Sequence, residues 1–467
     1  MNLKMSRRIS VFLLFSAAIA ANVAHAQDTF ASDSLVKSIL DARIASKRGM
    51  GFVVAVLEKG KPPRVHTAGV SGFAGVPLDA NTVFEIGSIT KVFTGALLAD
   101  MVSRGEVKLD DPVSKYLPAT VRVPARNGKQ ITLLDLATQS SGLPRLPTNF
   151  RPADQRNPYA DYSVAQLYQF LSSYTLTRDI GEKYEYSNLG VGLLGHVLSL
   201  RAAKPYGQLL KERILDPLGM NDTRIDLTPS MKSRVAQGFN AAGTPMSLWD
   251  LPTLAGAGAL RSTANDMLKF LAANLDSSSA PLGKVLTRAR TSIRVADRPG
   301  NRIGLGWHVV DVFGSTQTWH NGGTGGFRTF IGLDQAKHHG VVVLSNSTIN
   351  PDDIAFHLLV PQIPLEGAAP PPKARVEVAV DPYKLSPYVG VYELAPNFQL
   401  AITLEGGSLF GQATGQTRLQ LHPESETEFF LKDIDAQVTF VKDSTGKVNQ
   451  LILHQNGANI PGRRVVR

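Results

Sequence analysis

Apolar positions change spacing in a definite order along the chain. Residues 32–48 have the three- and four-residue apolar spacing of a helix, and strand-like runs follow at 51–57 and 64–70. From residue 88 to about 217 the spacing is mainly helical. Strand-like runs then return at 304–312, 316–320, 327–333 and 341–344, and a helix is expected near 351–359. The pattern predicts an α+β domain whose sheet is assembled from both ends of the segment, with a helical insertion packed against it.

The pattern changes beyond residue 360. Residues 361–375 contain Ala368-Ala369-Pro370-Pro371-Pro372, a composition that is typical of a linker. Residues 376–467 consist of short alternating runs separated by tight turns such as Glu405-Gly406-Gly407. We therefore expect residues 27–360 to form the main domain and residues 376–467 to form a small all-β barrel or sandwich.

The first residues have the layout of a secretory leader. Basic residues within the first eight positions precede an almost wholly apolar stretch at 9–21, and Ala24-His25-Ala26 has the small residues that a signal peptidase recognises. We expect residues 1–26 to be a signal peptide, which predicts a periplasmic or secreted protein. The alternative is a membrane anchor, but about 13 apolar residues are few for a span of roughly 20. No stable membrane span is expected elsewhere in the chain.

Composition narrows the possible chemistry. The 467 residues are 43% hydrophobic and 19% charged, which is typical of a globular protein with more than one core. The formal net charge of +10 comes from scattered lysines and arginines, so we expect a small-molecule substrate and no nucleic acid. The absence of cysteine excludes disulfides, thiol catalysis and cysteine-ligated metals. No histidine pair has the spacing of a zinc enzyme either, so we expect no metal and no cofactor. The oligomeric state is left open.

A serine three residues before a lysine places a hydroxyl and an amine on one face of a helix. This spacing occurs three times, as Ser34/Lys37, Ser88/Lys91 and Ser444/Lys447. The first and last pairs have charged or turn-like neighbours and are interpreted as solvated surface. Ser88 and Lys91 begin a helix that is apolar nearly all round, where they form one narrow stripe with Gly95. The alternative interpretation is a helix-capping serine beside a lysine whose stem packs along the helix.

Neither a lysine nor a tyrosine alone is a useful base at neutral pH. At a pKa of about 10.4, deprotonating lysine costs roughly 4.6 kcal/mol at pH 7. Burial lowers the pKa of a lysine, and a nearby ammonium lowers the pKa of a phenol, so a Ser/Lys/Tyr cluster can share one mobile proton. Tyr186, in Tyr184-Glu185-Tyr186-Ser187-Asn188 ahead of an apolar helix, is the candidate phenol. It could equally be an aromatic packing residue.

A glycine-rich segment lies between two of the late strands, at Trp319-His320-Asn321-Gly322-Gly323-Thr324-Gly325-Gly326-Phe327. Glycines there allow a substrate backbone to lie close along the edge of a strand. The backbone N–H groups of Ser88 and Gly323 could then form an oxyanion hole. Taken alone, such a segment is usually only a hairpin.

These three segments, in this order, resemble the three motifs of the serine β-lactamases and penicillin-binding proteins. The matching residues are Phe84 to Gly95, Tyr186-Ser187-Asn188 and His320-Asn321-Gly322. The stretches 104–118, 131–138 and 304–307 are also similar to class C β-lactamases and their relatives. The resemblance covers about residues 32–360 and implies a β-lactamase/transpeptidase-like sheet flanked by helices. The C-terminal segment resembles the lipocalin-like β-domains appended to some of these hydrolases.

The resemblance implies three catalytic residues. Ser88 is the nucleophile that becomes acylated, and Lys91 and Tyr186 share the roles of general base and general acid. The residues that the resemblance assigns to substrate binding are Asn188, His320, Gly322 and Gly323.

Two positions depart from the class C pattern. His320 stands where many members carry the lysine of a Lys-Thr-Gly triad, and Leu146 stands about where class C enzymes place a glutamine. A neutral imidazole binds a carboxylate more weakly than an ammonium does, and carboxypeptidase-type and esterase-type relatives often carry histidine here. The expected function is hydrolysis of β-lactams or related D-alanyl amides and esters through an acyl-Ser88 intermediate, with a class C-like β-lactamase favoured. The alternatives are a DD-carboxypeptidase or esterase of the same fold, and a non-hydrolytic protein that binds penicillin or muropeptides.

Overall fold

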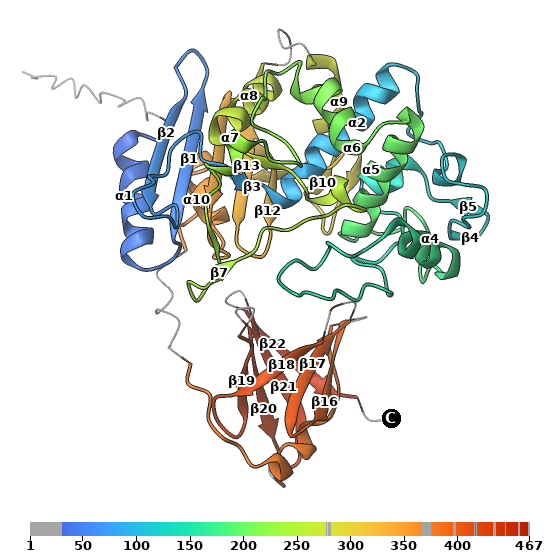
Figure 1. Cartoon of the computed structure of the whole chain (residues 1–467), viewed down its shortest axis with the longest axis vertical. Helices are drawn as coiled ribbons and strands as arrows, with labels where there is room; N and C mark the ends of the chain where they lie inside the picture. Colours follow the sequence, from blue (N-terminus) through green and yellow to red (C-terminus); the bar gives the residue numbers. More distant parts are fainter. Residues whose placement is uncertain are drawn as a thin grey trace, which may run out of the picture.

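The structure is a computed structural model with a larger α+β body and a smaller C-terminal barrel (Figure 1). It describes residues 30–465 except 277, 279–281, 367–374, 396, 397, 415, 417, 433–435, 444, 456 and 457. The predicted signal peptide and most of the predicted linker therefore lie outside the described residues. Within the described part of the chain, no helix combines the length and the apolar character needed to cross a bilayer.

An antiparallel sheet of eight strands forms the centre of the larger body. From one edge to the other, its strands are β2 (Arg64–Gly69), β1 (Gly51–Glu58), β14 (His339–Ser345), β13 (Arg328–Asp334), β12 (Ser315–Gly323), β11 (His308–Val312), β10 (Asn301–Ile303) and β9 (Arg294–Val295). The early strand β1 pairs with the late strand β14 over seven residues, so blue and orange strands lie side by side in Figure 1. This pairing confirms the prediction of a sheet assembled from both ends of the domain.

The strand predicted at 304–312 begins only at His308 in the structure, because residues 304–307 form a turn. β10 ends at Ile303, and the chain turns before β11 begins at His308. Gly306 within this turn has a φ of +87°, a left-handed conformation that glycine adopts readily. A Cβ on this residue would lie 2.6 Å from the Lys91 carbonyl oxygen, so the turn packs directly against the helix that carries Lys91. The contact of this turn with α2, rather than the apolar pattern, therefore decides where β10 ends and β11 begins.

Helices cover both faces of the sheet. One face carries α1 (Asp33–Ala45) and α10 (Asp352–Leu359), and the other carries α2 (Thr90–Ser103) and α8 (Ala264–Leu275). The remaining α-helices lie between β2 and β9 in the sequence and are α3 (Leu133–Ala137), α4 (Val164–Ser173), α5 (Asn188–Ala202), α6 (Tyr206–Leu210), α7 (Pro229–Lys232) and α9 (Gly283–Arg290). Helices α3 to α6 form the predicted helical insertion, and α4, α5 and α6 lie to the right of the sheet in Figure 1.

Strand β1 shows why the sheet is buried on both sides. Val54 and Val56 belong to the core shared with α1 and α10, whereas Val53 and Ala55 belong to the core shared with α2 and α8. Successive side chains of a strand point to opposite faces, so a strand with two covered faces is apolar at every position. This is why residues 51–57 read as a continuous apolar run.

Short paired segments lie outside the main sheet. Three two-stranded sheets are formed by β3 (Phe84–Glu85) with β8 (Arg261–Ser262), β4 (Ala125–Arg126) with β5 (Lys129–Gln130), and β6 (Gly238–Phe239) with β7 (Pro245–Met246). The first of them lies immediately before the turn η1 (Gly87–Ile89), which leads into α2. It therefore fixes the direction from which the chain enters α2.

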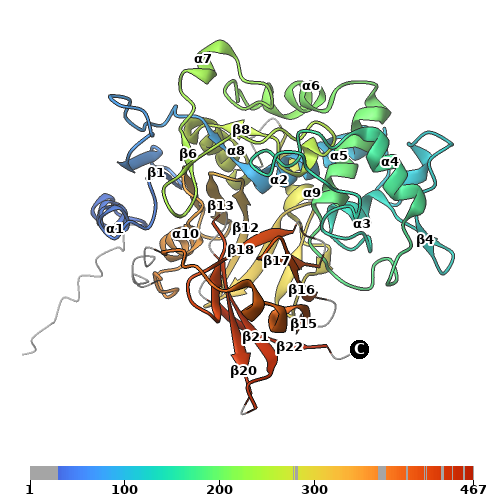
Figure 2. The same cartoon turned by 60° about the horizontal axis from the view of Figure 1, so that its bottom comes forward.

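The C-terminal residues form a closed barrel of eight strands, confirming the all-β prediction (Figure 2). Its strands follow sequence order: β15 (Gly390–Ala395), β16 (Phe398–Glu405), β17 (Ser408–Ala413), β18 (Leu419–Pro423), β19 (Glu428–Phe430), β20 (Ala436–Lys442), β21 (Val448–Gln455) and β22 (Ala458–Arg464). β22 pairs with β15 and closes the barrel. Aromatic side chains such as Tyr388, Tyr392, Phe429 and Phe440 fill the interior, so the barrel encloses a packed core.

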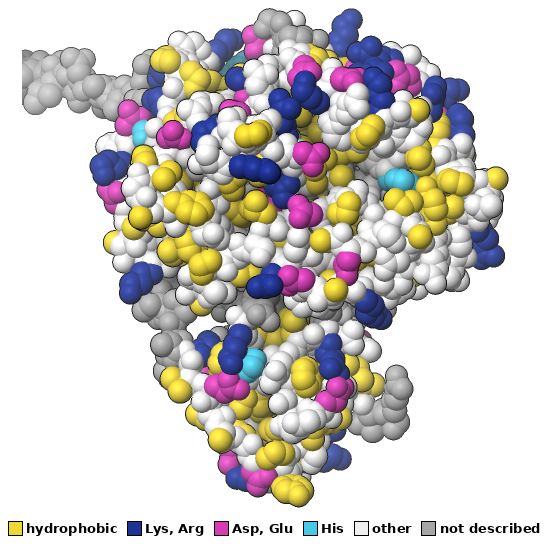
Figure 3. All heavy atoms as spheres, in the orientation of Figure 1, with side chains coloured by type: hydrophobic (Ala, Val, Ile, Leu, Met, Phe, Trp, Pro, Cys, Tyr) yellow, Lys and Arg dark blue, Asp and Glu magenta, His cyan; other side chains and the backbone are white. Residues whose placement is uncertain are grey.

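Charged side chains are mixed on the surface. In the face shown in Figure 3, lysine and arginine side chains are interspersed with aspartate and glutamate over both the larger body and the barrel. The scattered basic residues of the sequence thus do not gather into one broad basic patch on this face.

Candidate active site

Ser88 lies in η1, the single turn ahead of α2. Within residues 82–101 only Ser88 is partly exposed, and every other residue of this stretch is buried. Gly87 has a φ of +50°, and a Cβ on it would lie 2.6 Å from the backbone nitrogen of Gly323. The turn therefore presents one accessible hydroxyl directly beside the end of β12, where the sequence predicts an oxyanion hole.

Lys91 is fully buried, one helical turn after Ser88. Its Nζ lies 2.9 Å from Ser88 Oγ, 2.8 Å from Asn188 Oδ1 and 2.7 Å from the Ala257 carbonyl oxygen. Burial lowers the pKa of Lys91 well below its usual value, and the nearby charge of Arg145 lowers it further. Lys91 has no ion pair with a carboxylate among the described residues. These conditions favour the neutral amine.

The contacts of Lys91 also fix the direction of its lone pair. A neutral amine has two N–H groups and one lone pair. The oxygens of Asn188 and Ala257 can only accept, so both N–H groups point to them. The lone pair then faces Ser88 Oγ, at a distance suited to removal of the serine proton. This geometry suits a neutral Lys91 to accept the proton of Ser88.

Asn188 is held in the orientation that this requires. Its Nδ2 donates to the Tyr159 hydroxyl at 3.0 Å, which leaves Oδ1 for Lys91. Asn188 is the first residue of α5, and Ser187 caps that helix by accepting from Gly190 N at 2.8 Å. Ser187 Oγ also donates to the Pro144 carbonyl oxygen at 2.6 Å, so the loop ahead of α5 is fixed from both sides.

Tyr186 lies beside Lys91 and Arg145. Its ring centroid is 4.8 Å from Lys91 Nζ and 5.1 Å from Arg145 Cζ. Burial raises the pKa of Tyr186 to about 12, although a hydrogen bond with Ser88 and the charge of Arg145 oppose the rise. The phenol is therefore protonated at neutral pH, and Tyr186 is suited to pass on a proton rather than to remove the first one.

The edge of β12 is open where the sequence predicts substrate binding. β11 pairs with β12 only as far as Trp319, whereas β13 pairs with it as far as Gly323. Among the described residues, 320–323 therefore have no strand partner on the side away from β13. An extended substrate can add to such an edge through backbone hydrogen bonds. The missing side chains of Gly322 and Gly323 let the Ile86 carbonyl and the Arg328 guanidinium pack directly against this strand.

His320 is buried and neutral. Its Nδ1 lies 2.6 Å from the Asn321 carbonyl oxygen, an acceptor, so the ring proton is on Nδ1. Burial lowers the pKa of His320 well below its usual value, and His308, whose ring centroid is 5.0 Å away, and Lys91 lower it further. The position of the family lysine thus carries no positive charge in this protein.

The structure brings the seven predicted site residues from three distant segments into one region. Sequence reasoning missed three contributors to it: the Ala257 carbonyl, the Tyr159 hydroxyl and the Arg145 guanidinium. A backbone carbonyl and a tyrosine in an irregular loop leave no sequence motif. Of the three, only Arg145 could have been noticed in the sequence, because it directly precedes Leu146, a position that departs from the class C pattern. The rejected pair Ser34/Lys37 is exposed on α1, and Ser444 lies outside the described residues.

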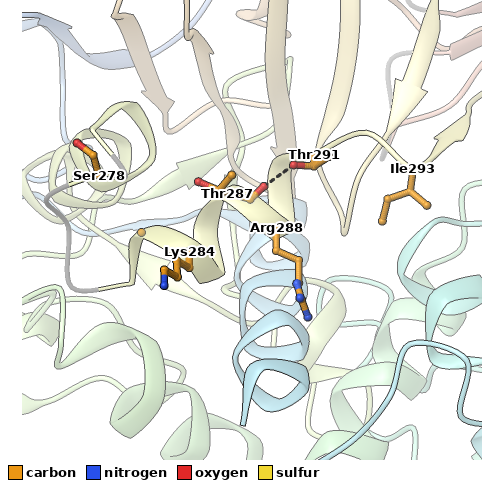
Figure 4. Close-up of a pocket in the computed structure, with 7 residues that line it drawn as sticks. Ser278, Lys284, Thr287, Arg288, Thr291 and Ile293 are labelled. Atoms are coloured by element: carbon orange, nitrogen blue, oxygen red, sulfur yellow. Dashed lines mark hydrogen bonds between the residues drawn. The ribbon is translucent and has the colours of Figure 1, made fainter. Parts of the chain in front are cut away.

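A hollow of about 620 Å³ lies elsewhere, beside α9 (Figure 4). Its lining consists of Ser278, Gly283, Lys284, Thr287, Arg288, Thr291 and Ile293, none of them a predicted site residue. Over the residues that the structure describes, no group of three or more histidine and acidic side chains is placed to hold a metal ion.

Comparisons with known proteins match the larger body and the C-terminal part to separate family models. The family model "Beta-lactamase" matches residues 36–359, and the model "Domain of unknown function (DUF3471)" matches residues 374–463. A D-alanyl-D-alanine-carboxypeptidase/endopeptidase, AmpH, from Escherichia coli is 33% identical over 279 residues, which are 56% of this chain and 71% of that protein. A β-lactamase from Pseudomonas fluorescens is 27% identical, with 67% of this chain and 92% of that protein covered.

A solved structure has the same fold. The β-lactamase/D-alanine carboxypeptidase from Yersinia pestis, in complex with citrate, matches with a TM-score of 0.60 and 27% identity, covering 68% of this chain and 94% of that one. The family model covers the whole eight-stranded sheet and the helices packed on it, apart from the first residues of α1. The chain therefore belongs to the β-lactamase family of serine hydrolases.

Proposed function

We propose that this protein is a periplasmic or secreted hydrolase that becomes acylated at Ser88 and acts on β-lactams or on D-alanyl amides and esters. The observation that carries the proposal is the environment of Lys91, whose amine is buried, bound by two carbonyl oxygens and 2.9 Å from Ser88 Oγ. The substrate class follows from the relatives, which are named as β-lactamases and as a D-alanyl-D-alanine carboxypeptidase. The leader-like residues 1–26 support export.

Acylation begins with Ser88. As Oγ attacks the substrate carbonyl, its proton moves to Lys91 Nζ and a tetrahedral oxyanion forms. The backbone N–H groups of Ser88 and Gly323 are the proposed donors to this oxyanion, supported by the contact between Gly87 and Gly323. The proton then reaches the leaving nitrogen or oxygen through the Tyr186 hydroxyl, which forms a hydrogen bond with Ser88 and lies beside Lys91. The bond to the leaving group breaks and an ester of Ser88 remains.

Deacylation repeats the proton transfers with water. A water molecule attacks the ester carbonyl and gives its proton to the Lys91–Tyr186 pair, which returns one to Ser88 Oγ as the acid leaves. We assign this chemistry to residues 27–360, with residues 361–375 as a linker and residues 376–467 as a separate lipocalin-like β-domain. The packed core of the barrel supports a domain that folds around its own side chains.

Labelling with a penicillin tests the proposal. The wild-type protein is incubated with benzylpenicillin and its intact mass is followed with time, alongside Ser88→Ala. The matched control is Ser34→Ala, because Ser34 belongs to the exposed pair with the same spacing. We expect the adduct in the wild type and in Ser34→Ala and none in Ser88→Ala. An adduct that persists in Ser88→Ala, or that maps to another side chain, contradicts the proposal.

The lifetime of the adduct separates the members of this substrate class. Rapid loss of the adduct with turnover of a chromogenic cephalosporin indicates a β-lactamase. A long-lived adduct in a protein that releases D-alanine from acyl-D-alanyl-D-alanine indicates a carboxypeptidase. A long-lived adduct without hydrolysis of any amide or ester overturns the enzymatic proposal in favour of a binding protein.

A further inference from the structure

A buried ion pair holds one residue of an irregular loop beside the catalytic region. Glu85 of β3 and Arg261 of β8 lie opposite each other in their two-stranded sheet, and both are buried. Glu85 Oε1 accepts from the backbone nitrogen of Trp249 at 2.7 Å, and Arg261 Nη2 donates to the carbonyl oxygen of the same residue at 2.7 Å. Trp249 belongs to residues 247–250, which form no helix or strand. The two charged side chains therefore fix a residue that regular backbone pairing does not.

The indole of Trp249 packs against two parts of the catalytic region. Its ring centroid lies 5.5 Å from that of Tyr159. A Cβ on Gly325 would lie 2.7 Å from Trp249 Nε1, so the indole also occupies the space that this glycine leaves. Gly325 comes two residues after Gly323, the proposed oxyanion donor at the end of β12. Trp249 therefore connects the loop that carries Tyr159 with the segment that follows β12.

Side-chain hydrogen bonds also join the loops of Trp249 and Tyr159. The backbone nitrogen of Asp250 donates to Asn157 Oδ1 at 2.8 Å, and Asn157 Nδ2 donates to Asp250 Oδ2 at 3.0 Å. Packed side chains and hydrogen-bond networks of this kind carry energetic coupling between separate elements. A displacement of the first loop is thus expected to displace the second.

Tyr159 links these loops to the catalytic base. It is buried, and its hydroxyl accepts from Asn188 Nδ2 at 3.0 Å, while Asn188 Oδ1 accepts from Lys91 Nζ at 2.8 Å. The terminal torsion of an asparagine is broad, so hydrogen bonds at both ends of its amide are what hold it in one orientation. If Tyr159 moves away, Asn188 is held by Lys91 alone, and the amine loses its fixed direction toward Ser88.

We propose that Trp249 is a positioning residue of the catalytic site, and that Glu85 and Arg261 hold it in place. The indole keeps Tyr159 within hydrogen-bonding distance of Asn188, which in turn directs the base. A misplacement of about 1 Å at a reacting centre costs on the order of 100-fold in rate, so even a small shift of this loop matters. This inference rests on the proposed hydrolase function and adds to it residues that act through Asn188.

A double-mutant cycle tests whether Trp249 acts through Tyr159. The rate of acylation by benzylpenicillin is measured with the full chain as wild type, Trp249→Ala, Tyr159→Phe and the double variant. We expect a loss of roughly 10-fold in Tyr159→Phe, within the range for one buried hydrogen bond, and of roughly 10- to 100-fold in Trp249→Ala. The double variant should be no slower than Trp249→Ala, because the hydroxyl contributes only while the indole holds it in place.

The matched control for the lost hydroxyl is Tyr162→Phe. Tyr162 is buried three residues after Tyr159, and its hydroxyl donates to Asn149 Oδ1 at 3.2 Å, so this variant should be acylated at the wild-type rate. Gly325→Ala displaces the indole by a second route, because the added methyl group must push it aside. This variant should also slow acylation, and it takes the place of Trp249→Ala in the cycle if melting curves show the latter to be unfolded.

Variants of Glu85 test the ion pair. Glu85→Ala removes the acceptor for the Trp249 nitrogen and should slow acylation roughly 10-fold, whereas Glu85→Gln keeps an acceptor and should recover most of that loss. The control is Asp353→Ala, which breaks another buried ion pair, with Arg43, between α1 and α10. Asp353→Ala should lower the melting temperature and leave the acylation rate unchanged. The comparison separates a loss of stability from a loss of positioning.

A second acyl donor separates positioning from direct contact with the substrate. 6-Acetamidopenicillanic acid lacks the phenyl ring of benzylpenicillin and is otherwise the same. Trp249→Ala should lose the same factor on both penicillins, because the indole acts on the base and not on the acyl group.

Several outcomes contradict the inference while the proposed function stands. They are additive losses in the double variant, unchanged acylation in folded Trp249→Ala or Glu85→Ala, and a loss in Trp249→Ala that depends on the acyl group. A wild-type protein that neither penicillin acylates contradicts the proposed function, and the inference falls with it.

Discussion

Gly322 of β12 lies directly against Ile86, so that a Cβ on the glycine would overlap the Ile86 carbonyl oxygen. The same carbonyl accepts from Thr329 Oγ1 at 3.0 Å, a bond from the neighbouring strand β13. Ile86 is the residue before η1, the turn that carries Ser88. This contact therefore sets the distance between the nucleophile and the strand that is proposed to bind the substrate.

Substituting Gly322→Ala tests that distance. The added methyl group must push η1 away from β12, and a displacement of this kind at a reacting centre costs roughly 100-fold in rate. We expect that loss in the rate of penicillin acylation, with the overall fold retained by circular dichroism. Gly411→Ala on β17 is the control, because a Cβ there meets its nearest neighbours at 3.5 Å, an ordinary contact. Equal acylation rates in both variants would show that the contact does not position Ser88.

Removing the amine of Lys91 should stop acylation more completely than changing any surface lysine. We expect Lys91→Ala to slow acylation by at least about 100-fold, because no base then receives the Ser88 proton. Lys91→Arg should be equally slow, since a guanidinium does not lose its proton in this pH range. The rate of adduct formation by mass spectrometry measures both. Lys37→Ala, in the exposed pair on α1, should behave as the wild type; unchanged acylation in Lys91→Ala would refute the role assigned to Lys91.

The pH dependence of acylation should report the pKa of Lys91. The reaction needs the neutral amine, so kcat/KM should fall as pH drops through that pKa, which burial holds well below the usual lysine value. Arg145 lowers the pKa further by its charge. Substituting Arg145→Gln should therefore move the acidic limb of the pH profile to higher pH. An acidic limb that stays in place, or moves to lower pH, would contradict Lys91 as the titrating group.

Glu85 should make the stability of the protein pH-dependent. Burial raises the pKa of Glu85 from 4.5 to about 7, even though Arg261 and the Trp249 N–H favour the charged form. Between pH 4.5 and 7 the unfolded chain releases this proton while the folded protein keeps it, so the free energy of unfolding falls as pH rises. Relative to Glu85→Gln, the wild type should lose about 3 kcal/mol over this range. Urea unfolding at several pH values measures the difference, and parallel pH curves for the two proteins would contradict the assignment.

The barrel should unfold independently of the larger body. Phe440 is buried in the barrel core against Tyr388 and Phe429, and Phe440→Ala should cost about 3–5 kcal/mol of barrel stability. Phe410, which is only partly buried with Arg418 over its ring, gives a milder control in Phe410→Ala. All three tryptophans of the chain lie before residue 320, so their fluorescence reports on the larger body, while hydrogen exchange reports on residues 390–464. A parallel shift of both signals in Phe440→Ala would show that the two parts unfold together.

Local patterns were sufficient for much of this fold. The apolar run of β1 and the alternation of the barrel strands reflect which faces are buried. Buried positions carry apolar side chains, so this information is present in the sequence at each position. The pair Ser88 and Lys91 was also predictable, because a spacing of three residues at the start of a helix places both on one face by geometry alone. The sequence alone also determined the order of the three motifs.

Only the tertiary structure decided how those motifs act. Burial and the charge of Arg145 lower the pKa of Lys91, and both arise only when distant segments pack together. The Ala257 carbonyl that accepts from Lys91 is a group that every residue type offers equally, so it leaves no mark in the sequence. The turn at Gly306 that separates β10 from β11 likewise arises where distant backbone segments meet. The same is true of the position of Arg328 against Gly323. Spacing along a chain specifies which side chains share a face, whereas distances and charges between separate elements are set when their surfaces pack.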